Sequence, residues 1–256
     1  MKLTNRNYYS RKMNRHYISV SQFKAMERCQ AAALAEINGE FEREETTALL
    51  VGSYVDSYFE GTLDKFKAEH PDIFKRDGTL KAEYIQAEAI IQRIERDKLF
   101  TEYMSGEKQV IMTGEICGVP VKIKVDSLHP DKIVDLKIMR DFESIYDSEK
   151  GKLPYFEAWG YDLQAAVYQE IVRQNTGKTL PFYLATATKE KVPDIDIVHI
   201  NPKSLDFALG HFKANVEMYD AIKKGVIPPE RCEKCAYCKE TKVLTEPTDS
   251  EEFYLM

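Results

Sequence analysis

Two neighbouring segments with apolar residues at every second position constrain the fold of this chain most strongly. Residues 119–128 and 131–138 both show this alternation, which is typical of β-strands with one face on a core. The polar turn around Pro130 is short enough to join the two strands as an antiparallel hairpin. We therefore expect two paired strands whose second faces carry the charged residues.

Three of those charges are predicted to lie together. Asp126 lies near the end of the first strand, and Asp135 and Lys137 lie on the second. Two close carboxylates repel each other unless a cation lies between them, and hard divalent ions such as Mg²⁺ prefer oxygen ligands. The pattern allows a metal site with a lysine beside it, and equally an exposed hairpin face with an ordinary Asp–Lys pair.

The rest of the chain alternates between helical and extended patterns, with no internal repeat. Ser19 or Ser21 can cap a helix that runs to Asn38 and ends at Gly39, and Pro154 and Gly177 bound a long later helix. Further helices are expected near 46–61, 82–98 and 203–224, and further strands near 108–116, 181–188 and 194–200. This order predicts an α/β or α+β fold with a central mixed sheet flanked by helices.

Composition limits the class of protein. The 256 residues are 43% hydrophobic and 30% charged, which is typical of a soluble globular chain large enough to bury a core. No apolar run approaches the ~20 residues of a membrane span, and no signal peptide precedes the first helix, so we expect a cytoplasmic protein. The net charge of −6 disfavours a generally basic coat protein for nucleic acid but allows a local basic groove.

The two ends differ in charge. Residues 1–18 form a basic arm whose tyrosines, Tyr8 and Tyr9, could stack on bases while its cations follow a phosphate backbone. A frayed terminus is the alternative. Residues 241–256 form an acidic tail that we expect to be disordered, which leaves 19–240 as the folded domain.

The long helix after Pro154 carries a Gln–Tyr pair. Gln164 and Tyr168 are four residues apart and face the same way, although such a pair is commonly only the shoulder of a helix. The apolar stripe of this helix is expected to comprise Phe156, Trp159, Leu163 and Val167.

The five cysteines favour metal ligation over disulfides. Cys232, Cys235 and Cys238 form a C-x₂-C-x₂-C pattern, and an odd count without a secretory signal disfavours a disulfide framework. Three thiolates need a fourth ligand, and zinc, an iron–sulfur cluster or three unligated thiols all remain open. Cys117, beside a strand, is expected to be a small buried hydrophobic residue.

Taken together, these motifs resemble the PD-(D/E)XK nuclease superfamily across residues 19–240. Asp126, the "DLK" of 135–137 and the "QAAVY" of 164–168 match its Asp, Asp-x-Lys and Gln-x-x-x-Tyr order, most closely in the phage and RecE-type exonuclease branch. That branch has an upstream G-x-x-x-H helix, and here Gly52 is followed by Asp56 where the histidine would stand. A carboxylate can also bind Mg²⁺ or Mn²⁺.

The resemblance implies a restriction-endonuclease-like core and a Mg²⁺- or Mn²⁺-dependent DNA exonuclease of phage-type recombination or repair. Asp126, Asp135, the carbonyl of Leu136 and Asp56 would bind the metal. Lys137 would orient the attacking water or stabilise the phosphate, and Gln164 and Tyr168 would position DNA or the lysine. Glu115 is a candidate additional acid.

Cys29 resembles the early cysteine of AddB-like Fe–S nucleases, in which it joins three late cysteines around a [4Fe–4S] cluster; the late spacing here departs from that pattern. Such a cysteine-ligated metal centre would join the N- and C-terminal segments. The resemblance also allows a toroidal oligomer and a single-strand annealing or recombination protein as partner, in a bacterial or phage-infected host. Two alternatives are a catalytically silent nucleic-acid-binding protein of the same fold and a zinc-containing interaction protein.

Overall fold

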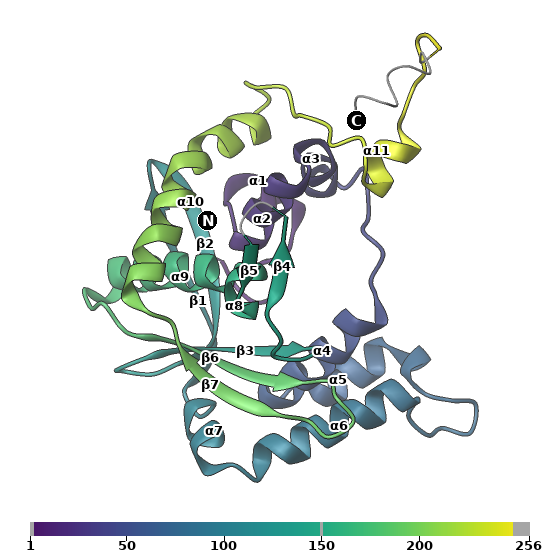
Figure 1. The fold of residues 1–256 in the computed structure, drawn as a ribbon, viewed down its shortest axis with the longest axis vertical. Helices are drawn as coiled ribbons and strands as arrows, with labels where there is room; N and C mark the ends of the chain where they lie inside the picture. Colours follow the sequence, from purple (N-terminus) through teal and green to yellow (C-terminus); the bar gives the residue numbers. More distant parts are fainter. Residues whose placement is uncertain (1–2, 149–150, 248–256) are drawn as a thin grey trace.

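A five-stranded mixed sheet forms the centre of the protein, as a computed structural model describing residues 3–148 and 151–247 shows (Figure 1). The strand order is β1-β2-β3-β6-β7, in which only the β3–β6 pair is parallel. Alternation of apolar residues predicted all five strands within a few residues. Their bounds are β1 Glu107–Ile116, β2 Val119–Leu128, β3 Ile133–Met139, β6 Phe182–Thr188 and β7 Ile195–His199.

Helices cover both faces of the sheet, and each face has its own core. On β3, Ile133 belongs to one core while Val134 and Leu136 belong to the other, as the period of two requires. The first core includes residues of α2 Val20–Arg28, α3 Gln30–Asn38, α9 Tyr161–Thr176 and α10 Pro202–Lys223. The second includes residues of α4 Thr47–Phe59, α6 Ala82–Glu95 and α7 Lys98–Tyr103. The predicted mixed sheet flanked by helices is confirmed.

Two of the predicted helices are each broken into two. The first breaks at Cys29, which has an extended backbone (φ −168°, ψ 110°) and both ends α2 and begins α3. The second breaks at Gly160, whose φ of 61° separates α8 Tyr155–Ala158 from α9. Trp159 is consequently 57% exposed and does not continue the apolar stripe, so that part of the prediction is wrong.

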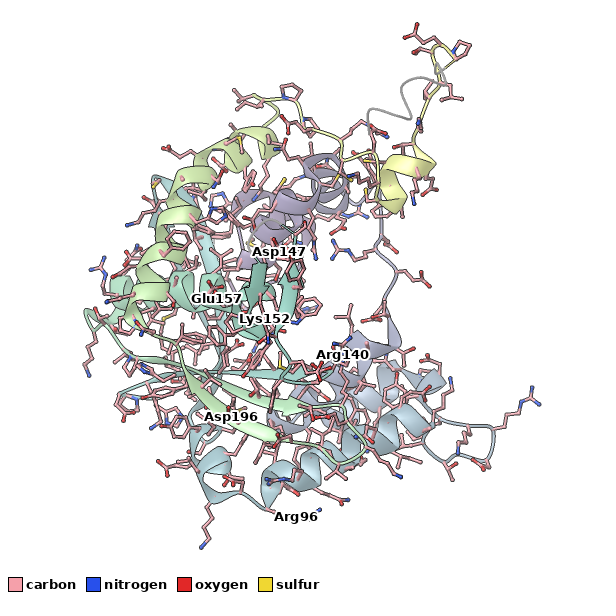
Figure 2. All side chains as sticks on the ribbon, viewed as in Figure 1. Arg96, Arg140, Asp147, Lys152, Glu157 and Asp196 are labelled. Carbon is pink, nitrogen blue, oxygen red and sulfur yellow. The ribbon has the colours of Figure 1, made fainter. Side chains whose placement is uncertain are left out.

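Several short elements gave no usable sequence pattern. They are α1 Arg11–His16, α5 Leu63–Glu69, the 3₁₀ helix η1 Pro71–Ile73, α11 Ala236–Glu240, and the β4 Ile145–Asp147 and β5 Gly151–Leu153 hairpin. The hairpin is inserted between β3 and α8, and Figure 2 places Asp147, Lys152 and Glu157 on this part of the chain. Strands of three residues are too short to establish a period, so they could not be predicted.

The described part of the N-terminal arm packs against β2. Tyr8 is 5% exposed, Ser10 caps α1, and Ile18 forms a parallel bridge with Val121. The frayed-terminus alternative is therefore wrong for residues 3–16. At the other end, most of the predicted acidic tail (248–256) lies outside the described residues.

The buried position expected for Cys117 is wrong. Cys117 and Gly118 form the two-residue turn between β1 and β2, with φ of 52° and 72°. Positive φ at both central residues is the geometry of a type I′ hairpin turn, which projects its side chains into solvent. Cys117 is accordingly exposed.

Within the described ranges, no helix combines the length and the apolar character needed to cross a membrane.

Candidate active site and cysteine cluster

The centre of the candidate active site lies where β2 and β3 separate. Their ladder includes only the pairs Ser127↔Val134 and Leu128↔Ile133, so Asp126 and Asp135 stand at the first position beyond it. There the Asp126 carboxylate replaces a backbone acceptor: its Oδ2 accepts from the Leu136 N–H at 3.0 Å. The gap between the strands thus leaves room for side-chain oxygens.

Asp135 is held from two directions. Its side chain is buried, Oδ2 forms an ion pair with the Lys137 ammonium, and Oδ1 accepts from Gln164 Nε2 at 2.7 Å. Lys137 also donates to the Leu136 carbonyl at 3.2 Å. The convergence of Asp126, Asp135 and Lys137 predicted from alternation is therefore present, and Gln164 on α9 donates to the aspartate.

Asp56 reaches the same place from α4. It lines a small cavity together with Asp126, Gln109 and the Leu136 backbone region. Asp56 Oδ1 and Gln109 Oε1 are buried and have no hydrogen-bond partner, while Gln109 Nε2 donates to Asp126 Oδ1 at 3.3 Å. Buried acceptors without donors are costly. A cluster of such oxygens beside two carboxylates fits a hard divalent cation.

The pKa values of Asp56, Asp135 and Lys137 are shifted from their ordinary values. Burial, with a contribution from Asp126, raises the pKa of Asp56 well above its ordinary value. Burial also raises the pKa of Asp135 to about 7, against the opposing effect of Lys137. Burial disfavours the Lys137 ammonium, but Asp135 and Asp126 outweigh it and raise its pKa. A bound divalent cation would stabilise the charged carboxylates, which is the state that its ligands require.

Sequence reasoning missed four residues around this site. Gln109 has a φ of 53°, a conformation that costs energy in a non-glycine residue, and Glu60 lines the same cavity. Near Lys137, the Tyr161 ring has two ammonium groups over it, with its centre 5.5 Å from the ammonium of Lys137 and 5.2 Å from that of Lys24. Burial lowers the pKa of Lys24 to about 8. Nothing in the spacing of these residues distinguishes them from ordinary strand and helix positions.

The structure also places the two remaining predicted residues, Tyr168 and Glu115. Tyr168 packs edge-on to Phe182 at 6.3 Å, and burial raises its pKa well above the usual range. Glu115 is not part of the site, because it lies opposite Pro120 at the far end of the β1–β2 ladder. Six residues of strand separate Pro120 from Asp126, or about 20 Å. The candidate role of Glu115 as an additional acid is therefore wrong.

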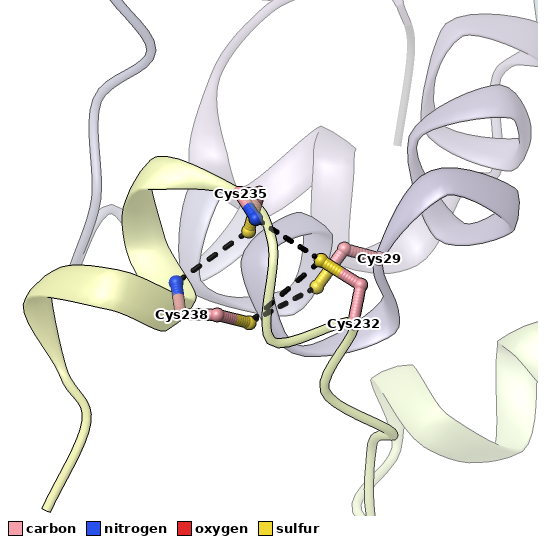
Figure 3. Close-up of side chains that lie close together, drawn as sticks. All are labelled: Cys29, Cys232, Cys235 and Cys238. Carbon is pink, nitrogen blue, oxygen red and sulfur yellow. Dashed lines mark hydrogen bonds between the residues drawn. The ribbon is translucent and has the colours of Figure 1, made fainter. Parts of the chain in front are cut away.

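The second cluster consists of Cys29, Cys232, Cys235 and Cys238. Their sulfur atoms all lie within 4.8 Å of one another, and Figure 3 shows the four side chains converging from α2–α3 and the C-terminal segment. Cys29 Sγ lies 3.6 Å from Cys238 Sγ, although the two residues are 209 positions apart. Cys117, by contrast, is exposed in its turn. A four-cysteine site between the two ends of the folded domain, inferred from the sequence, is present.

Backbone N–H groups donate hydrogen bonds to sulfur atoms of this cluster. The Cys235 N–H donates to Cys232 Sγ at 3.3 Å, and the Cys238 N–H donates to Cys235 Sγ at 3.5 Å. Backbone N–H groups lower the pKa of Cys232 to about 6. The adjoining chains are also joined, since the Ala31 N–H donates to the Glu230 carbonyl at 2.9 Å. Four converging cysteines, of which Cys29, Cys232 and Cys235 accept hydrogen bonds from backbone N–H groups, fit a tetrahedral or cluster-type metal centre.

With this geometry established, comparison with known proteins is informative. Residues 19–241 match the model of a family described as a "PDDEXK-like domain of unknown function (DUF3799)". The chain belongs to this PDDEXK-like family. Within the solved structures, it is similar to one described as a "Putative exonuclease" from Eubacterium rectale, with a TM-score of 0.96 and 48% identity over 99% of this chain and 98% of that one. No curated protein matches it.

The match to the PDDEXK-like family includes the residues of the first cluster. Asp126 on β2, Asp135 and Lys137 on β3 and Gln164 on α9 are the positions at which the superfamily motif was predicted. The fold and the family are thus shown. What each residue does depends on the chemistry proposed below.

Proposed function

We propose that this PDDEXK-like protein is a metal-dependent deoxyribonuclease, and specifically an exonuclease that hydrolyses phosphodiester bonds of linear DNA. The observation that carries the proposal is the group of buried oxygens at the split of β2 and β3. Asp56 Oδ1 and Gln109 Oε1 lack partners beside Asp126 and Asp135. The description of the Eubacterium rectale structure supports the same class of reaction.

Asp126, Asp135, Asp56 and the Leu136 carbonyl are the groups that would hold Mg²⁺ or Mn²⁺. A divalent ion, when bound, supplies charge stabilisation at the phosphate and lowers the pKa of water. Lys137 needs no metal to be positioned: Asp135 and the Leu136 carbonyl hold its ammonium. There it can donate a hydrogen bond to a non-bridging phosphate oxygen or orient the attacking water. Gln164 fixes Asp135 at 2.7 Å and so fixes the lysine indirectly.

The four cysteines form a structural metal centre in this proposal. The resemblance to AddB-like nucleases predicts a [4Fe–4S] cluster. The sulfur separations of 3.6 and 4.0 Å also match a tetrahedron around one zinc ion, whose edge is about 3.8 Å for bonds of ~2.3 Å. Elemental analysis of protein purified without oxygen distinguishes an iron–sulfur cluster from a zinc ion. Protein with neither iron nor zinc near one site per chain would contradict the metal centre.

The cellular role proposed from the resemblance is phage-type recombination or repair in the cytoplasm of a bacterial or phage-infected host. A single-strand annealing protein is the partner that such an exonuclease would supply with DNA. The resemblance allows a toroidal oligomer, and the mass of the protein in solution tests it.

The decisive experiment compares the digestion of end-labelled linear duplex with that of covalently closed circular DNA, with Mg²⁺ or Mn²⁺. We expect the linear DNA alone to be degraded from its ends. Asp135→Ala and Lys137→Ala should each lower the rate by at least ~10²-fold, whereas Asp131→Asn, whose side chain is 73% exposed, should not. Wild-type rates in either active-site variant would remove the assignment of the site. Equal cleavage of circular DNA would indicate an endonuclease.

A further inference from the structure

Tyr8 and Tyr9, neighbours in the basic N-terminal arm, have different positions, and the difference indicates how DNA could approach the site. Tyr8 is 5% exposed, and its carbonyl accepts from the buried ammonium of Lys122 on β2. The same ammonium donates to Asn14 Oδ1 at 2.7 Å and lies 4.4 Å from the centre of the Tyr8 ring. Tyr8 and Lys122 thus anchor the arm to the sheet.

Tyr9 is held in place but leaves its ring free. Its carbonyl accepts from Asn14 Nδ2 at 3.1 Å, and its ring packs edge-on to Tyr8 at 4.9 Å. The side chain is nevertheless 70% exposed. An aromatic ring that is held by a neighbouring ring and remains largely exposed can stack on any base.

A cation lies over this exposed ring. The Lys124 ammonium is 5.2 Å from the centre of the Tyr9 ring and 5.7 Å from that of Tyr8. Arg6 and Lys12 on the arm are exposed. Lys124 also acts on Glu60, where it opposes the rise in pKa that burial causes. Aromatic rings interleaved with cations form the usual surface for single-stranded nucleic acid. We call Tyr9 and Lys124, with their anchors Tyr8 and Lys122, the tyrosine ledge.

The tyrosine ledge adjoins the active site. Lys122, Lys124 and Asp126 occupy alternate positions of β2, so Lys124 lies about 7 Å along the strand from Asp126. A stacked strand of DNA advances about 3.4 Å per nucleotide, so this distance corresponds to about two nucleotides. A strand with its phosphate at Asp126 would pass Lys124 and then Tyr9.

We propose that the tyrosine ledge binds single-stranded DNA a few nucleotides from the scissile phosphate, with a base stacked on Tyr9 and a phosphate paired with Lys124. This inference rests on the proposed nuclease function and adds its substrate class: the enzyme engages an unpaired segment of the strand that it cleaves. Because stacking does not distinguish between bases, binding at the ledge is independent of sequence.

The test measures binding without cleavage. Fluorescence anisotropy with labelled oligothymidine and with a blunt hairpin duplex, both in EDTA, is compared for the wild type and four variants. Tyr9→Ala should weaken binding of the single strand by about 5- to 150-fold. Tyr9→Phe should restore it, because the ring is kept. Phe207→Ala removes an equally exposed ring (79%) on α10 and should change nothing. Lys124→Gln should reduce the salt slope by about 0.7.

Each outcome bears on the proposal separately from the nuclease function. Unchanged affinity of Tyr9→Ala for oligothymidine, or an equal loss on the blunt duplex, would overturn the tyrosine ledge even if the wild type cleaves DNA. Failure of the wild type to bind oligothymidine would overturn it too. A Tyr9-dependent affinity in a protein that does not cleave DNA with Mg²⁺ or Mn²⁺ would support the ledge and refute the nuclease. Because Tyr9 is exposed, thermal unfolding of all four variants should match that of the wild type.

Discussion

Replacing Asp56 by asparagine should stabilise the metal-free protein while weakening its response to metal. Asp56 comes from α4, its Oδ1 is buried without a partner, and Asp126 lies close enough to raise its pKa. In the absence of metal this carboxyl therefore disfavours folding. In the presence of metal it would be a ligand. Asparagine keeps the shape of the side chain and removes the charge, so the two effects can be measured in one variant.

The expected gain without metal follows from removing a buried charge that has no partner. A buried polar group without a partner costs about 1–3 kcal/mol. If asparagine recovers about 1–2 kcal/mol, the midpoint of thermal unfolding should rise by about 2–8 °C for a chain of this size. A carboxyl whose pKa is raised in the folded state lowers stability increasingly as pH rises above its unfolded pKa. The advantage of Asp56→Asn should consequently be largest near neutral pH and should vanish near pH 4.

The loss with metal can be estimated in the same way. At a metal concentration of about 100 times the dissociation constant, binding stabilises the wild type by about 2.7 kcal/mol. If the lost ligand weakens binding tenfold, the same concentration stabilises the variant by only about 1.4 kcal/mol. Addition of Mg²⁺ or Mn²⁺ should thus raise the unfolding midpoint about half as much in Asp56→Asn as in the wild type.

Thermal unfolding followed by circular dichroism, with and without metal, tests both parts. Asp131→Asn is the matched control, because the same substitution is made at an exposed position in the β2–β3 turn. A lower midpoint for metal-free Asp56→Asn would show that the carboxyl is satisfied in the folded protein. An unchanged metal response would show that α4 contributes no ligand.

Two further predictions concern the cysteine cluster and the buried Lys122 on β2. Cys29→Ser and Cys235→Ser should each lower the free energy of unfolding by more than about 2 kcal/mol, because loss of the metal centre destabilises the fold. Cys117→Ser, at an exposed turn, should have little effect. Equal unfolding curves for Cys29→Ser and Cys117→Ser would contradict the metal centre. Burial lowers the pKa of Lys122 to about 8, so the unfolded chain binds more protons than the folded one between pH 8 and 10.5. Denaturant titrations of the wild type and Lys122→Met give the difference between their free energies of unfolding. This difference should rise by up to about 3 kcal/mol in favour of the wild type between pH 8 and 10.5. A difference that does not change with pH would contradict the burial of Lys122.

The sequence determined the strands and the residues that β3 and α9 bring together. Alternation placed Asp126, Asp135 and Lys137 on β2 and β3, and helical spacing placed Gln164 on α9, because side-chain direction within one element follows from its period alone. The C-x₂-C-x₂-C spacing likewise indicated metal ligation, since three thiols within seven residues are close in any compact conformation. The identification of Cys29 as the fourth ligand needed the resemblance, because 209 residues separate it from Cys238.

Only the tertiary structure decided which groups complete each site. Gln109 and Glu60 became part of the cavity because β1 and α4 pack beside the split of β2 and β3, and no local pattern encodes that packing. Glu115 was excluded for the same reason: the β1–β2 register places it opposite Pro120. The neighbouring Tyr8 and Tyr9 were equivalent in the sequence. The buried ammonium of Lys122, more than a hundred residues away, fixes one and leaves the other exposed, because contacts between distant segments depend on how the whole chain closes around its two cores.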